Sequence, residues 1–189
     1  MFVWPQRSTR QSCLLKCSER NPFLHTKLKP ILHTKRDRML QAYHDILNGD
    51  NDLAKMAAAK AWSLWEARCA TLRPSPQVIE RFIEPHMAVS LAQIEVHYFV
   101  NKGFMEADQI LSSMDTIKDI PGVIIHGRYD SVCPLDNAFS LAQNWLNSDL
   151  HIIRDAGHSS SEPSITDALV RSTDEAVRIL SKRPVDNIT

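Results

Sequence analysis

A change of pattern at Pro121 constrains the fold more than any other feature of this sequence. Before it, apolar residues recur at helical spacing. Directly after it, residues 123–125 form a β-branched apolar run, and helical spacing resumes over residues 135–145. A second short apolar run over 150–153 and a last helical pattern over 164–182 follow. Strand, helix, strand, helix in this order is typical of a parallel sheet covered by helices.

Two strands do not make a stable sheet by themselves, so the second half of the chain indicates the end of a larger α/β sheet. Residues 37–115 show a series of helical patterns and no strand pattern. The longest of these patterns is rich in alanine. We expect Asp50 or Asp52 to cap that helix, Pro74 and Pro76 to end it, and Pro85 to close the next one.

Glycine is scarce, which excludes several nucleotide and serine chemistries. The chain has five glycines, no two of them four residues apart. A G-x-S-x-G serine elbow is therefore absent from these 189 residues, as are the G-x-G-x-x-G and P-loop patterns. Four cysteines and eight histidines form no metal-binding spacing, so we expect reduced thiols, no metal and no cofactor.

The net charge of zero hides an asymmetry. Residues 1–38 carry nine Lys/Arg and two Asp/Glu, a balance of +7, and the remaining residues have the opposite balance. A basic arm suits nucleic acid or an import system, but we favour a disordered or unrelated leader over residues 1–36, with no nucleic-acid partner. No apolar run approaches the ~18 residues that span a bilayer, and no secretory pattern opens the chain. We therefore expect a cytoplasmic protein without membrane contact.

Two side chains that carry chemistry follow the two predicted strands. Asp130 comes just after the first strand and His158 just after the second. Parallel strands end at one edge of the sheet, where ligands bind in open α/β sheets. A carboxylate beside an imidazole forms the two lower members of a nucleophile–His–Asp triad, and acid before base is the chain order of α/β-hydrolases. Gly127 and Gly157 are expected to permit tight turns there.

Four stretches resemble the proline iminopeptidase (prolyl aminopeptidase) family of α/β-hydrolases. They are AAAKAWSLWE (57–66), IEVHYFVNKGF (94–104), IPGVIIHGRYDSVCPL (120–135) and AGHSSSEPSITDALVRSTDE (156–175). The resemblance runs in order over about residues 37–182. It implies a helical cap at 37–115 and, at 116–189, the C-terminal part of an α/β-hydrolase sheet whose N-terminal half is missing. That missing half would hold the oxyanion loop and the serine nucleophile.

The resemblance also implies roles for five residues. Asp130 matches the triad acid and His158 the triad base. Glu66 and Glu95 match cap glutamates that hold the free α-amino group of the substrate, and Cys133 matches a cysteine beside the pocket for the N-terminal proline. Two carboxylates suit one ammonium group because charge-assisted hydrogen bonds are the strong ones. No residue matches the nucleophile.

The function implied is that of a serine-type prolyl aminopeptidase acting on peptides with an N-terminal proline. Because the nucleophile and oxyanion donors are missing, we expect this chain to be inactive by itself. Two alternatives stay open: a catalytically dead paralogue or fragment that binds peptides or a partner, and a chain that folds poorly because its sheet is uncovered. The oligomeric state is left open.

Overall fold

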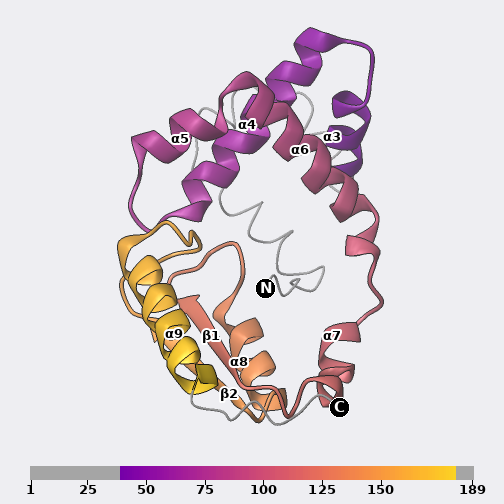
Figure 1. The fold of residues 1–189 in the computed structure, drawn as a ribbon. Helices are drawn as coiled ribbons and strands as arrows, with labels where there is room; N and C mark the ends of the chain where they lie inside the picture. The colour runs from indigo at the N-terminus through magenta and orange to yellow at the C-terminus, as the bar shows by residue number, and fades with distance from the viewer. Residues whose placement is uncertain (1–38, 182–189) are drawn as a thin grey trace.

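The computed structural model describes residues 39–181, so the expectation for residues 1–36 lies outside the described residues. Helices α3 to α6 gather at one end, and both strands with α8 and α9 at the other (Figure 1). No helix within this described range is long and apolar enough to cross a membrane. In chain order the elements are α3 (Met39–Leu47), α4 (Asp52–Ala70), α5 (Pro76–Phe82), α6 (Pro85–Val100), η2 (Lys102–Phe104), α7 (Gln109–Ser112), η3 (Met114–Thr116), β1 (Gly122–Gly127), α8 (Leu135–Asn144), β2 (Ser148–Ile153) and α9 (Pro163–Ser181).

Prolines begin helices in the first part of the chain. Pro76 is the first residue of α5 and Pro85 the first of α6, whereas α4 already ends at Ala70. A first-turn N–H has no partner within the helix, so proline loses nothing there. The expectation that these two prolines end helices was therefore wrong. The N-cap of α4 is Asn51, whose side chain accepts a hydrogen bond from the Ala54 N–H at 3.0 Å, rather than either neighbouring aspartate.

The two strands form a parallel pair, in register from Gly122 opposite Ser148 to Gly127 opposite Ile153. Helix α8 connects them and packs against both, while α9 packs against β1 on the other side of the pair (Figure 1). The strand–helix–strand–helix order predicted from the sequence is thus confirmed. Together with the helices, this small parallel sheet is compatible with part of an α/β-hydrolase. The domain boundary near residue 115 stays a prediction.

The core of the helical part centres on Trp62, which is 3% exposed. Its ring centroid lies 5.1 Å from that of Tyr43 on α3 and 5.9 Å from that of Phe99 on α6. Burial raises the pKa of Tyr43 to about 12, because the phenolate would lose its hydration. Ala59 and Ala88 are fully buried where α4 meets α6, so small side chains let the two helices approach closely. This packing fixes α4 and α6 relative to each other.

Candidate functional site

A tight turn after β1 orients the carboxylate of Asp130. Its Oδ1 accepts hydrogen bonds from the backbone N–H groups of Val132, at 2.9 Å, and Cys133, at 2.7 Å. Aspartate favours this local arrangement because its short side chain reaches the backbone two and three residues ahead. The side chain of Asp130 is only 5% exposed. One carboxylate oxygen is thus held by the turn, and the other, Oδ2, is left to face the neighbouring turn.

The neighbouring turn follows β2 and carries His158. The Nδ1 atom of His158 lies 2.9 Å from Oδ2 of Asp130. The two turns meet because β1 and β2 are parallel and in register, so both strands end at the same edge of the sheet. The proximity expected from the sequence is present. An imidazole whose Nδ1 proton is directed at a carboxylate presents Nε2 for proton transfer, which is the arrangement of a base and its orienting acid.

Opposing effects set the pKa of His158. Burial lowers the pKa, while the hydrogen bonds and charges of Asp130 and Cys133 raise it, and the balance raises the pKa from 6.5 to about 10. The neighbouring carboxylate therefore favours the protonated form of the imidazole.

A second imidazole, which sequence reasoning did not single out, lies beside the same carboxylate. Nε2 of His126, on β1, lies 3.0 Å from the carbonyl oxygen of Cys133 and 3.7 Å from Oδ2 of Asp130. Its contact with the Cys133 carbonyl closes the turn that holds Asp130. The only signal in the sequence is its position four residues before Asp130, at the end of an apolar run.

The two turns touch through their backbones at Gly127. A Cβ atom at Gly127 would lie 1.9 Å from the carbonyl oxygen of Gly157, which no side chain tolerates. Neither glycine has a positive φ. The tight turns expected here are therefore explained by close backbone approach, since no side chain fits between the two turns at Gly127. The Tyr129 N–H reinforces the contact by donating to the carbonyl of Ala156 at 3.0 Å.

Glu66 and Glu95 lie on the two helices that pack in the core, α4 and α6. Glu66 is 7% exposed, an unusual degree of burial for a carboxylate. Oε2 of Glu95 accepts a hydrogen bond of 2.7 Å from Nε1 of Trp62. Because Trp62 precedes Glu66 by one helical turn, this bond ties Glu95 to the same part of α4. Both carboxylates are thus attached to one rigid helix pair.

Cys133 completes a compact cluster with the acid and the imidazole. Its thiol is buried beside Trp65 and Cys69. Single ligand-type atoms of Cys133, Asp130 and His158 all lie within 4.8 Å of one another. Nitrogen, oxygen and sulfur donors at such a spacing suit a zinc-class ion. Both carboxylate oxygens of Asp130 already accept hydrogen bonds, however. A metal ion would have to displace at least one of these hydrogen bonds to bind Asp130.

Comparison with known proteins identifies what the chain is similar to. It is 46% identical over 144 residues to a proline iminopeptidase of Xylella fastidiosa, a match that covers 76% of this chain and 46% of the relative. It is 41% identical over 133 residues to one of Arabidopsis thaliana (70% and 35%) and 33% identical over 147 residues to one of Neisseria meningitidis serogroup B (77% and 46%).

No family model matches the sequence. The chain spans about half the length, or less, of the curated relatives that it matches. Their shared name and the extent of the matches agree with the resemblance carried by the four sequence stretches. The chain belongs to the proline iminopeptidase family.

Proposed function

We propose that this chain carries the acid–base pair and the amine-binding carboxylates of a serine-type prolyl aminopeptidase. The observation that carries the proposal is the 2.9 Å contact between His158 Nδ1 and an Asp130 carboxylate whose other oxygen is fixed by two backbone N–H groups. In the complete reaction a serine would attack the first peptide carbonyl. His158 would take the proton of that serine, and Asp130 would hold the imidazole in the correct orientation.

The substrate would be a peptide with an N-terminal proline. Its free secondary ammonium group needs negatively charged acceptors, and Glu66 and Glu95 would supply them. The burial of Glu66 supports this role, because a carboxylate removed from water attracts a cation more strongly than an exposed one. Cys133 would lie beside the proline ring, since its buried thiol neighbours His158.

By itself the chain is proposed to be inactive, because the resemblance leaves the nucleophile without a counterpart in these residues. Its 189 residues contain no G-x-S-x-G elbow that could present a serine at a strained turn.

The activity test compares the purified chain with its His158→Ala variant on a proline arylamide. We expect the two proteins to release arylamine at the same rate as buffer. A rate above buffer that His158→Ala abolishes would contradict the proposed inactivity and would show that another group serves as nucleophile.

A second candidate function is peptide binding without catalysis. It is favoured by the rigid placement of Glu95 through Trp62, because a binding site formed by α4 and α6 requires no nucleophile. Calorimetry with a peptide that begins with proline tests it, and the same peptide with an acetylated N-terminus is the ligand control. We expect Glu66→Gln and Glu95→Gln each to weaken binding by about tenfold or more, the effect of losing one charged acceptor.

Glu80→Gln, an exposed position on α5, is the matched protein control for that experiment. It should bind the peptide as the unchanged chain does. Equal affinity for the free and acetylated peptides, or no binding at all, would exclude recognition of the amine by these residues.

A further inference from the structure

Both turns of the candidate site attach to the carboxyl end of α4. The Ser131 hydroxyl, from the turn of Asp130, donates to the carbonyl of Cys69 at 3.3 Å. The N–H groups of His158 and Ser159 donate to the carbonyl of Ala70 at 3.0 and 2.7 Å. The last carbonyls of a helix have no acceptor role within the helix, so they need donors from elsewhere. Here the two turns supply those donors.

The carboxylate of Glu162 strengthens this attachment by accepting hydrogen bonds from both segments. Oε1 of Glu162 accepts a hydrogen bond of 2.6 Å from the N–H of Gly157, the residue before His158. Oε2 of the same side chain accepts one of 3.0 Å from the N–H of Leu72, just beyond α4. Glu162 therefore bridges two segments of backbone that are far apart in the sequence. The packing is tight: a Cβ atom at Gly157 would lie 2.9 Å from the Leu72 nitrogen and 3.1 Å from Glu162 Oε1.

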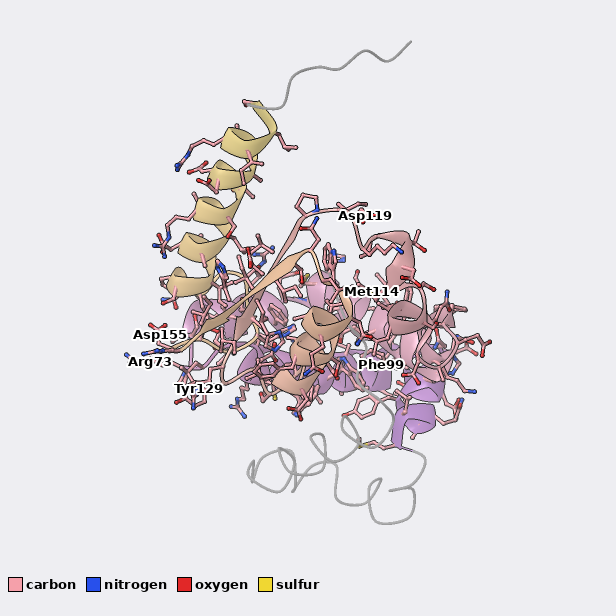
Figure 2. All side chains as sticks on the ribbon, turned by 90° about the horizontal axis from the view of Figure 1, so that it is seen from below. Arg73, Phe99, Met114, Asp119, Tyr129 and Asp155 are labelled. Carbon is pink, nitrogen blue, oxygen red and sulfur yellow. The ribbon has the colours of Figure 1, made fainter. Side chains whose placement is uncertain are left out.

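Figure 2 shows the same meeting of segments from below. In this projection the labels of Arg73, which follows α4, of Tyr129 from the turn after β1 and of Asp155 from the turn after β2 fall in one region. The hydrogen bonds from His158 to Ala70 and from Tyr129 to Ala156 agree with this view. Three segments thus converge on one end of α4, and the carboxylate of Glu162 lies among them.

We infer that Glu162 is a positioning residue for His158: its carboxylate ties the turn that carries the imidazole to the end of α4, and so fixes the imidazole relative to Glu66 on that helix. The inference rests on the proposed function. Glu162 itself touches neither the substrate nor the reacting atoms in this scheme.

The chemistry of an aminopeptidase explains why such a tie is needed. In a peptide the terminal amine and the first carbonyl carbon are separated by a single Cα atom. A site that binds the amine and moves a proton at the carbonyl must therefore hold its two groups at one fixed separation. A misplacement of about 1 Å costs on the order of a hundredfold in rate. Glu66 and Ala70 are one helical turn apart on α4. A turn attached at Ala70 therefore holds His158 at a fixed distance from Glu66.

The test uses the chain as it is and compares Glu162→Ala and Glu162→Gln with Glu175→Gln. Glu175 is exposed on α9 and pairs with Arg178, so it controls for loss of a surface carboxylate. Hydrogen exchange of the Gly157 and Leu72 amides is followed by NMR, together with the ring resonances of His158. In Glu162→Ala we expect both amides to exchange at least about tenfold faster, since each loses a charged acceptor.

Glutamine keeps the size of glutamate but has a single acceptor oxygen, because its amide nitrogen only donates. In Glu162→Gln one of the two amides should therefore stay protected while the other exchanges faster. The proton between His158 Nδ1 and Asp130 should exchange faster in Glu162→Ala and less so in Glu162→Gln. A purely structural role of Glu162 would lower overall stability without this graded effect on the imidazole.

The inference is overturned if His158 and both amides behave in Glu162→Ala as they do in the unchanged chain. Should Glu162→Ala fail to fold, the decision falls to Glu162→Gln, in which equal protection of both amides would refute the bridge. None of these measurements depends on peptide binding or hydrolysis. A chain that binds no peptide but shows the graded effect would refute the proposed function and leave the tie to α4 in place.

Discussion

Replacing Asp130 by asparagine separates the charge of this residue from its shape. The amide oxygen of asparagine can still accept from the N–H groups of Val132 and Cys133, so the turn after β1 should survive. The amide nitrogen would then face His158 Nδ1 in place of a negatively charged oxygen. The variant thus loses the charge-assisted hydrogen bond to the imidazole of His158 and sets an N–H donor against Nδ1. It also removes the negative charge that lies 3.7 Å from Nε2 of His126.

The sign of the effect follows from the direction of the pKa shift. Burial lowers the pKa of His158, and the larger combined effect of Asp130 and Cys133 raises it from 6.5 to about 10. The resulting stabilisation is fully present below pH 6.5 and is lost as the pH rises through about 10. This net shift includes the opposing effect of burial, so it does not divide into separate shares for the two partners. The Asp130 hydrogen bond should contribute about 2–3 kcal/mol, the usual value of a hydrogen bond between charged groups.

Urea denaturation at several pH values between 6 and 10.5 measures this contribution. The unchanged chain should exceed Asp130→Asn in unfolding free energy by about 2–3 kcal/mol at pH 6, and the difference should shrink towards zero above pH 10. Asp119→Asn, an exposed position before β1, should match the unchanged chain throughout. A difference between the chain and Asp130→Asn that stays constant with pH, or an imidazole of His158 that titrates near 6.5 by NMR, would refute the reasoning.

Three further changes test other parts of the structure. Gly127→Ala places a methyl group 1.9 Å from the Gly157 carbonyl oxygen and should cost about 3 kcal/mol of unfolding free energy in urea; a cost below 1 kcal/mol would contradict the close approach. Trp62→Phe removes the donor to Glu95 and should cost at least about 2 kcal/mol, with weaker peptide binding as a second readout; a stability equal to that of the unchanged chain would argue against the bond. Val177→Lys with Leu180→Lys replaces side chains on α9 that are 63% and 59% exposed, and should reduce self-association in sedimentation while changing stability by less than about 0.5 kcal/mol. If the double variant self-associates to the same extent as the unchanged chain, Val177 and Leu180 do not mediate that association.

The central pair of the candidate site was predictable because it depends on a rule of sheets. Two apolar runs separated by a helical pattern predict parallel neighbours, and parallel neighbours end at one edge. Asp130 and His158 each follow such a run, so their proximity required no knowledge of distant contacts. Their catalytic roles, like those of Glu66 and Glu95, come from the family resemblance and stay predictions.

The supports of that pair could not be predicted from the sequence in the same way. Glu162 meets the Leu72 N–H across 90 residues, and no local period links the two. The need for glycine at position 127 arises from the backbone of another turn, which only the folded chain brings close. Asn51 caps α4 although two aspartates flank that start, because the backbone conformation of one residue decides which side chain reaches the free N–H.

The contacts between the helical part and the sheet bear on the proposal that the chain is inactive by itself. The turn of His158 takes its acceptors from α4 and Glu162, and the turn of Asp130 takes its donors from its own backbone. All of these groups lie within residues 39–181, so these residues hold Asp130 and His158 together by themselves. If the chain proves inactive while the Asp130–His158 hydrogen bond is observed in solution, the missing attacking group, and not a disordered base, accounts for the loss. If instead that hydrogen bond is absent in solution, the contacts of the His158 turn with α4 and Glu162 do not suffice to hold the imidazole against Asp130. The hydrogen bond must then depend on contacts outside these residues.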